Sequence, residues 1–133
     1  LEAMLHQHEV RSVNLPRRRD LDLARAAQAL LDREYRRPPN FADLAREIGT
    51  SQNKLKSVFK QTFGLTMADY CLERRVREAQ LLLMEATLTI AQVAERVGYE
   101  HQSSFAAAFR NQVGMSPREY RCHRAPFSLE FPA

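Results

Sequence analysis

The three lysines of the chain, Lys54, Lys56 and Lys60, lie within seven residues of one another. No Asp or Glu occurs from Ile48 to Ala68, so the stretch around the lysines carries only positive charge. Cationic side chains on one surface attract nucleic-acid phosphates, and this attraction supplies a large share of nucleic-acid affinity. An ordinary solvated helix face carries a similar run of charge, and the elements that hold the lysines decide between these two interpretations.

Other kinds of chemistry find little support in the sequence. It contains no Gly-rich phosphate loop, no zinc-protease motif and no nucleophile elbow, so we expect neither an enzyme nor a cofactor. A metal site would need Cys71, Cys122 and His123 to converge, and they lack the close spacing of metal-binding cysteines. We expect both cysteines to be free, buried thiols in a reducing cytoplasm. No apolar run approaches the length of a membrane span.

The lysines lie inside a sequence pattern that occurs twice. Residues 41–70 and 90–120 align throughout, with one extra residue in the second turn. Each copy carries an alanine where two helices would cross, followed four residues later by a glycine, at Gly49 and Gly98. Glycine adopts the positive φ that such a turn needs, and apolar residues then recur at helical spacing. The repeat predicts two helix-turn-helix units, an arrangement that places its second helix in the major groove of DNA.

Capping residues predict where most helices begin. Ser116-Pro117-Arg118-Glu119 combines a capping box with a proline at the first helical position, and Thr89 with Gln92 forms a second box. Further helix starts are predicted at Asp20, Asn40 and Thr66. Together these signals predict seven helices, at about 21–36, 41–48, 52–63, 67–85, 90–97, 102–113 and 117–123. No window alternates as a strand does, so we expect an all-α fold.

The predicted helix 67–85 is expected to join the helix-turn-helix units at 41–64 and 90–114. At about 1.5 Å per residue it would be about 28 Å long. Apolar residues at helical spacing should pack both units onto it. Its arginines alternate with Glu73 and Glu78, which predicts ion pairs within the helix.

Three parts of the chain are expected. Residues 20–122 form the helical domain, and 123–133 form a C-terminal tail with two prolines. Residues 1–19 are expected to be a linker or the remnant of a preceding segment. Within them, Arg17-Arg18-Arg19 is a minor-groove arm, a linker or a solvated stretch, of which we favour the linker. Because the chain begins with Leu1 and not with methionine, we expect a fragment or a cleaved product.

The repeat and the helix between its copies resemble the DNA-binding domain of the AraC/XylS family of bacterial transcription regulators. The matching segments are KLKSVFKQTFGLTMADY, RRVREAQLLL and VGYEHQSSFAAAFRNQVGMSPREYR, and the resemblance covers about residues 20–122. The matched positions are Arg75, Ala79, Leu82, Leu83, Gly98, Tyr99, Phe105, Phe109, Gly114, Pro117 and Tyr120. The lead-in LPRRRDLDLARAAQALLDREYRRPPNFADLA further resembles the branch that regulates siderophore uptake. The resemblance implies a cytoplasmic, sequence-specific DNA-binding domain that inserts two recognition helices into successive major grooves.

The resemblance also implies which residues contact DNA. In the first copy the base-reading positions are Asn53, Lys56 and Ser57, flanked by Thr50, Ser51, Lys54 and Lys60. In the second copy the matching positions are His101, Gln102, Ser103, Ser104, Ala107 and the backbone anchor Arg110. Ser103 and Ser104 are alternatively capping residues, and His101 is alternatively a plain exposed side chain. Because Ala106 and Ala107 replace long polar groups of many family members, we expect the second unit to bind mainly through phosphates and DNA shape.

The expected partner is double-stranded DNA, with RNA polymerase as a second partner if the protein activates transcription. An effector-sensing domain or a small-molecule ligand outside these 133 residues is a further candidate partner. Two other functions stay open. A helical protein-interaction module would explain the helices but not the acid-free lysine segment. An AraC-like part of a DNA-repair regulator would need a reactive cysteine and a zinc-binding cysteine cluster, which the sequence lacks.

Overall fold

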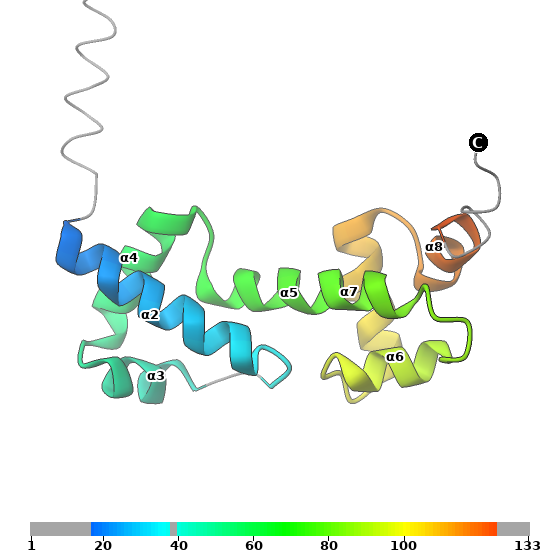
Figure 1. Cartoon of the computed structure of the whole chain (residues 1–133), viewed down its shortest axis with the longest axis horizontal. Helices are drawn as coiled ribbons and strands as arrows, with labels where there is room; N and C mark the ends of the chain where they lie inside the picture. The colour runs from blue at the N-terminus through cyan, green and yellow to red at the C-terminus, as the bar shows by residue number, and fades with distance from the viewer. Residues whose placement is uncertain (1–16, 38–39, 125–133) are drawn as a thin grey trace, which may run out of the picture. The chain divides into compact units, whose positions relative to one another are not determined.

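The computed structural model describes residues 17–37 and 40–124, and these ranges contain seven helices and no strand (Figure 1). The helices are α2 (Arg18–Glu34), α3 (Phe41–Ile48), α4 (Gln52–Phe63), α5 (Met67–Leu82), α6 (Ile90–Arg96), α7 (Gln102–Val113) and α8 (Pro117–Arg124). The predicted all-α fold with seven helices is therefore confirmed for this part of the chain. Most of the predicted linker and tail, at 1–16 and 125–133, lies outside the described residues.

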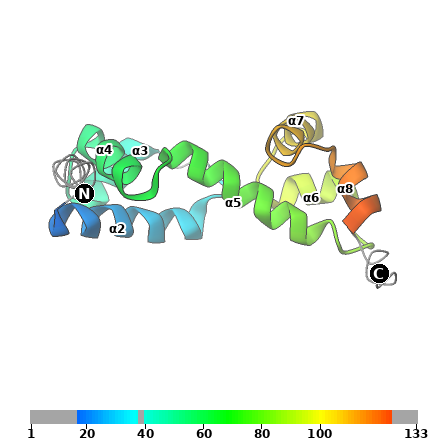
Figure 2. The ribbon, with the colours of Figure 1, turned by 90° about the horizontal axis from the view of Figure 1, so that it is seen from above.

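The chain divides into two compact units. Of the described residues, the first contains 17–34 and 40–70, and the second contains 35–37 and 71–124. Helix α5 begins in the first unit and continues without a break into the second, as Figure 2 shows. The predicted bridging helix is therefore present, and each unit holds one copy of the repeat.

In the first unit, α2, α3 and α4 contact one another around a mainly aliphatic core that includes the ring of Phe59. The fully buried or nearly buried members of this core are Ala24, Ala27, Leu31, Leu44, Ala45, Leu55, Val58, Phe59 and Met67. The ring of Phe59 lies 5.6 Å from that of Tyr70, edge to face at an interplanar angle of 77°. Such edge-to-face pairs add to the stabilisation from burial alone.

The second unit repeats this packing with α6, α7, α8 and the later part of α5. Its core consists of Val76, Ala79, Leu83, Leu88, Val93, Ala94, Val97, Phe105 and Phe109. Phe109 and Tyr120 occupy the same places in the repeat as Phe59 and Tyr70, and their rings also meet edge to face, at 5.5 Å and 72°. The duplication in the sequence is therefore a duplication of core geometry.

The predicted helix caps are formed by side-chain hydrogen bonds. Asn40 Oδ1 accepts from the amides of Ala42 and Asp43 at 2.9 and 3.2 Å. The Thr89–Gln92 and Ser116–Glu119 capping boxes both have their two reciprocal bonds. Because these short polar side chains satisfy amides that would otherwise lack partners, the starts of α3, α6 and α8 follow from local sequence.

Both predicted boundaries of α2 are wrong. Helix α2 begins at Arg18 and not at 21, because the amide of Leu21 bonds to the carbonyl of Arg17 at 2.9 Å and Asp20 therefore lies inside the first turn. It ends at Glu34 and not at 36, since Tyr35 and Arg36 turn away into the second unit.

Helix α5 ends at Leu82 and not at 85. Beyond Leu82 the backbone tightens, with the amide of Glu85 bonding to the carbonyl of Leu82 at 2.9 Å. The guanidinium of Arg121 then donates to the carbonyls of Leu83 and Glu85, at 2.8 and 3.1 Å. An arginine from α8 thus satisfies carbonyls that a longer helix would have bonded internally. Smaller differences occur at α6, which ends at Arg96, and at α8, which runs to Arg124.

Candidate nucleic-acid interface

The turn between α3 and α4 is built by local residues. Gly49 adopts a φ of +96°, and its amide donates to the carbonyls of Ala45 and Arg46. Ser51 then caps α4, because its Oγ accepts from the amide of Lys54 at 3.1 Å. The sequence therefore fixes where the second helix of this unit begins.

Helix α4 has one buried face and one exposed face. Leu55, Val58 and Phe59 are buried in the core of the first unit. The opposite face, called the α4 face below, consists of the exposed residues Asn53, Lys56, Ser57 and Lys60. These positions are three or four residues apart, so their side chains lie on one surface of the helix. An amide, a hydroxyl and two ammonium groups are thereby brought together.

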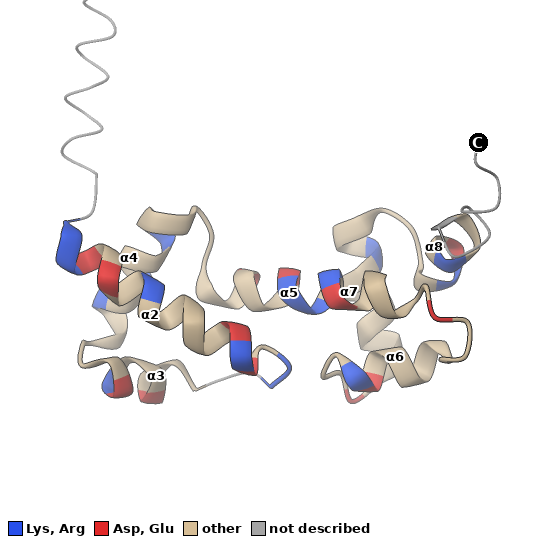
Figure 3. Ribbon diagram, viewed as in Figure 1, with Lys and Arg blue, Asp and Glu red and all other residues tan. Residues whose placement is uncertain are grey.

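Lys54 lies on the flank of α4 and not on this face. Its Nζ is 3.3 Å from Oδ1 of Asp20, whose side chain is only 14% exposed. Figure 3 shows the charged residues of α2 and α4 in this unit. The lysine segment, which lacks acidic residues in sequence, therefore has an acidic partner in space. The sequence did not predict the ion pair between Lys54 and Asp20, because it depends on how α2 packs against α4.

Thr50 and Ser51 lie in the turn that leads into α4. Thr50 is half-buried, and its amide bonds to the carbonyl of Ala45 at 2.9 Å. The Ser51 hydroxyl oxygen accepts the capping bond, and its hydrogen can still be donated. Both residues are therefore hydrogen-bonded at the start of α4.

In the second unit, the exposed surface of α7 carries fewer polar groups than that of α4. Its exposed residues Ser103, Ala107 and Arg110, called the α7 face below, correspond in the repeat to Asn53, Ser57 and Lys60. The counterpart of Lys56 is Ala106, which is half-buried. Gln102 and Ser104 are also exposed but lie beside this face. The α7 face therefore offers one hydroxyl and one guanidinium, against the four polar groups of the α4 face.

His101 occupies the N-cap position of α7. It makes no side-chain capping bond, and its Nε2 lies 3.9 Å from a carboxylate oxygen of Glu100. Ser103 and Ser104 are in the first turn of the helix, so neither serine is the N-cap. Unlike α4, helix α7 therefore begins without a side-chain cap.

The segment Tyr35–Arg37 is the least expected part of the second unit. Arg75 donates from Nε to the carbonyl of Tyr35 at 2.7 Å and from Nη2 to that of Arg36 at 3.3 Å. Glu78 accepts hydrogen bonds from the Tyr35 hydroxyl and the Arg36 guanidinium.

These contacts correct the predicted ion pairs within α5. Arg77 forms the predicted kind of pair along the helix, with Glu73 at 3.9 Å. Arg74 lies over the ring of Tyr35, with its guanidinium carbon 4.9 Å from the centroid. For Arg75 the prediction is wrong, because its guanidinium donates to the carbonyls of Tyr35 and Arg36, which are remote in sequence.

The environment of Glu78 sets the protonation of this cluster. Burial by itself would raise the pKa of Glu78, but hydrogen bonds from Arg36 and Tyr35 outweigh it and hold the pKa below its ordinary value of 4.5. Burial and the bond to Glu78 raise the pKa of Tyr35. The carboxylate is therefore ionised, and the phenol neutral, at neutral pH.

Glu78→Gln is expected to lower the free energy of unfolding at pH 7 by roughly 1–3 kcal/mol, because hydrogen bonds to a charged group are lost. A carboxylate whose pKa is lower in the folded than in the unfolded state stabilises the fold at pH values above the unfolded-state pKa. This contribution is lost as the pH falls through the folded-state pKa. The variant should therefore lose stability less steeply than the wild type below about pH 4.5. Urea denaturation between pH 7 and pH 3 measures both effects.

Glu73→Gln, which loses only the 3.9 Å pair with Arg77, is the control and should change little. Equal losses in the two variants would contradict the role given to Glu78.

Neither Cys71 nor Cys122 is in a disulfide, and only Cys71 is buried, so the expected burial of Cys122 is wrong. The last turn of α8 leaves Cys122 and His123 exposed to solvent. Among residues 17–37 and 40–124, no three His, Cys, Asp or Glu side chains lie where they could share a metal ion. No helix in those ranges is both long and apolar enough to cross a membrane.

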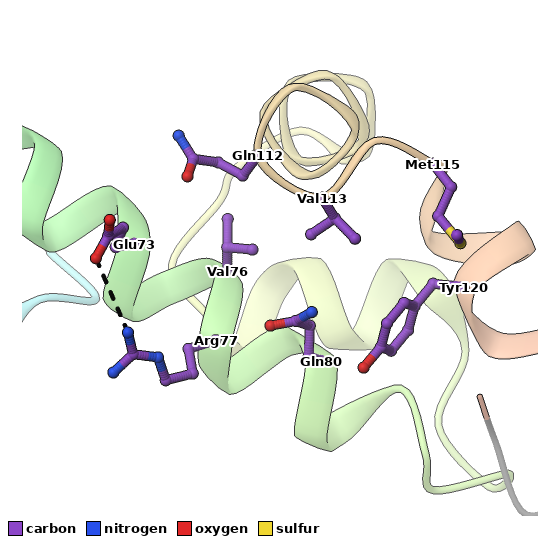
Figure 4. Close-up of a pocket in the computed structure, with 8 residues that line it drawn as sticks. All are labelled: Glu73, Val76, Arg77, Gln80, Gln112, Val113, Met115 and Tyr120. Atoms are coloured by element: carbon purple, nitrogen blue, oxygen red, sulfur yellow. Dashed lines mark ion pairs between the residues drawn. The ribbon is translucent and has the colours of Figure 1, made fainter. Parts of the chain in front are cut away.

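A groove of about 520 Å³ in the second unit lies between α5, α7 and the start of α8 (Figure 4). It is lined by Glu73, Val76, Arg77, Gln80, Gln112, Val113, Met115 and Tyr120. Its charged groups are the Glu73–Arg77 ion pair, and its other polar groups are two amides and a phenol. None of these side chains is a nucleophile with an adjacent base.

Known proteins share this arrangement. A family model described as a helix-turn-helix domain matches residues 44–123. A putative AraC-like transcription regulator of Streptomyces lividans is 35% identical over 97 residues, which are 73% of this chain and 32% of the regulator. The transcriptional activator RhaR of Yersinia pseudotuberculosis is 30% identical over 125 residues, which are 91% of this chain and 42% of RhaR. The chain thus spans less than half the length of these curated relatives.

A solved structure is similar over most of its length. It is a transcriptional regulator with an AraC-type DNA-binding domain from Chromobacterium violaceum, with a TM-score of 0.72 and 29% identity. The match covers 80% of this chain and 95% of that one. The likeness therefore extends to most of this chain and nearly all of the solved one.

Proposed function

Because the chain belongs to the AraC-type helix-turn-helix family of transcription regulators, we propose that it binds double-stranded DNA in a sequence-specific manner. The observation that carries this proposal is the α4 face, on the second helix of a helix-turn-helix. Asparagine and lysine hydrogen-bond to base edges in the major groove, and lysine attracts phosphates. In the complex, α4 and α7 would occupy successive major grooves.

The proposed contacts differ between the two units. In the first unit, Asn53, Lys56 and Ser57 read bases, while Thr50, Ser51 and Lys60 contact phosphates. Lys54 contributes less, because its charge is already paired with Asp20. In the second unit the contacts come from His101, Gln102, Ser103, Ser104, Ala107 and Arg110, of which only Arg110 carries a permanent charge.

Titration of labelled duplex DNA at two or more salt concentrations tests the proposal. Each phosphate neutralised by a cationic side chain releases counterions, so affinity falls steeply as salt rises. A protein-interaction module would show no such dependence. Weak binding without salt dependence would therefore overturn the DNA-binding function.

Lys56→Ala and Lys60→Ala are expected to act differently on DNA binding. Loss of a base contact at Lys56 should cost roughly 1–3 kcal/mol and relax preference at one or two base pairs. Loss of a phosphate contact at Lys60 should weaken all sequences similarly and reduce the salt slope by about 1. Binding assays with the preferred duplex and a scrambled duplex distinguish the two. If Lys56→Ala leaves affinity and preference unchanged, the base-reading role of Lys56 is wrong.

Base preference is expected to be unequal between the two half-sites. The α7 face carries Ala107 where the α4 face carries Ser57, and Ala106 replaces Lys56. The second unit should therefore depend on phosphates and DNA shape. Selection from a randomised duplex library should return one sharp half-site and one diffuse half-site. Two equally sharp half-sites would contradict the assignment.

The proposal involves no catalysis and no cofactor, and it places the chain in the cytoplasm with the DNA. RNA polymerase would be a further partner if the protein is an activator. An effector-sensing domain or a small-molecule ligand would act through parts of the protein outside this chain. Regulation of siderophore uptake stays a prediction. Neither a pure interaction module nor a DNA-repair role gains support from the comparisons.

A further inference from the structure

The turn of the second helix-turn-helix is held differently from that of the first. A Cβ added to Gly49 would have no atom within 4 Å, whereas a Cβ on Gly98 would lie 1.9 Å from the carbonyl oxygen of Arg36. Helix α4 has its own side-chain cap in Ser51, whereas the cap residue of α7, His101, makes no such bond. The start of α4 is therefore fixed by its own residues, and the start of α7 depends on tertiary contacts.

Arg75 supplies the most extensive of these contacts. Its guanidinium holds the carbonyls of Tyr35 and Arg36, and the second of these is the group that Gly98 approaches. The same guanidinium lies over the ring of Tyr99, with its central carbon 5.2 Å from the centroid. One side chain of α5 thus touches both the segment against which the turn packs and the residue that follows the glycine.

Tyr99 connects Arg75 to α7 through ring contacts. Its ring lies 5.7 Å from that of Phe105, which is fully buried near the start of the helix. A cationic group over a tyrosine ring is attracted by the ring's negative face, so Arg75 favours one position of Tyr99. A change at Arg75 would therefore reach the beginning of α7 through two packed rings.

We propose that Arg75 is a positioning residue for the second recognition helix, acting through Tyr35–Arg37 and Tyr99 on the turn at Gly98. In the first unit, the Ser51 side chain caps the start of α4. The consequence for DNA rests on the proposed function, namely that α7 contacts DNA. The positioning of the turn at Gly98 by Arg75 does not depend on DNA binding.

The first test needs no DNA. Arg75→Lys keeps the charge, but a single ammonium group lacks the planar fork that holds two carbonyls. In backbone amide NMR spectra we expect shifts from Gly98 to Ser104 and none from Gly49 to Ser57. Arg77→Lys, on the exposed side of the same helix, is the control and should leave both turns unchanged. Unchanged resonances from Gly98 to Ser104 in Arg75→Lys would overturn the proposal.

A second variant guards against general unfolding. Tyr99→Leu removes the ring over Arg75 but leaves the carbonyl bonds of Arg75 in place. It should shift the same amides by a smaller amount. Shifts that spread equally through the whole second unit in both variants would mean a purely structural role and would overturn the proposal.

The second test uses the duplex that the wild-type chain enriches from a randomised library, and a copy truncated to the first half-site. Arg75→Lys should lose about tenfold in affinity for the full duplex, as expected for one displaced set of contacts. It should lose less than about twofold for the truncated copy, which α7 does not reach. Equal losses on both duplexes would overturn the proposal. If the wild type binds neither duplex, the proposed function fails, and the NMR spectra alone decide on positioning.

Discussion

Gly98→Ala is expected to destabilise the second unit by about 3–5 kcal/mol, enough to unfold a marginally stable domain. Two costs combine at this residue. Gly98 has a φ of +100°, which residues with a Cβ rarely adopt. The added methyl would also lie 1.9 Å from the carbonyl oxygen of Arg36, which is backbone and is held by Arg75. A shift of the Arg36 carbonyl away from the methyl would disturb its bond to Arg75.

Gly49→Ala is the matched control, because the repeat places Gly49 at the same point of the first turn. Its φ is +96°, but nothing lies within 4 Å of the added methyl. The control should therefore carry only the backbone cost, about 1–2 kcal/mol. Urea denaturation, followed by far-UV circular dichroism, measures both variants. If the two substitutions cost the same, the close approach of Gly98 to Arg36 contributes nothing to stability.

Local sequence was a sufficient guide wherever short-range bonds decide the structure. The starts of α3, α6 and α8 follow from Asn40, Thr89 and Ser116, whose side chains bond to amides two or three residues away. The repeat then predicts that the same core geometry occurs twice, because equivalent apolar residues must be buried in equivalent ways.

Tertiary contacts explain the features that the sequence could not predict. Asp20 pairs with Lys54 only because α2 packs against α4, and these residues are 34 positions apart in the chain (54 − 20). Arg75 donates hydrogen bonds to the carbonyls of Tyr35 and Arg36. These two residues therefore do not continue α2, which ends at Glu34 and not at the predicted residue 36. Neither Asp20 nor Arg75 has a neighbour in the sequence that indicates its partner. An arginine next to glutamates, such as Arg75, predicts an ion pair within the helix as readily as a bond to a remote carbonyl.

The two units differ most in how many polar groups they offer to DNA. The α4 face has an amide, a hydroxyl and two ammonium groups, whereas the α7 face has one hydroxyl and one guanidinium. A second unit that reads few bases is still useful if it is tethered to the first. Once α4 is bound, α7 meets DNA at a high effective concentration, and a weak contact adds substantially to affinity.

Insertion of five base pairs between the two half-sites is therefore expected to weaken binding by about a hundredfold, the low end of the gain that a tethered second contact provides. Successive major grooves on one side of the duplex are about 34 Å apart, or one helical turn. Half a turn of added DNA moves the second groove to the opposite side. We therefore expect α7 to lose its contacts with the second groove while α4 keeps those with the first.

Gel-shift titration at fixed salt measures this loss, since affinities at different salt concentrations are not comparable. A five-base-pair insertion outside both half-sites is the control, because it changes the length of the duplex but not the spacing of the half-sites. It should leave affinity unchanged. The loss from the inner insertion should also be absent in a variant whose second unit no longer contacts DNA, such as Arg110→Ala combined with Gln102→Ala. If the inner insertion has no effect on the wild type, only one helix-turn-helix engages DNA, and the second unit has another role.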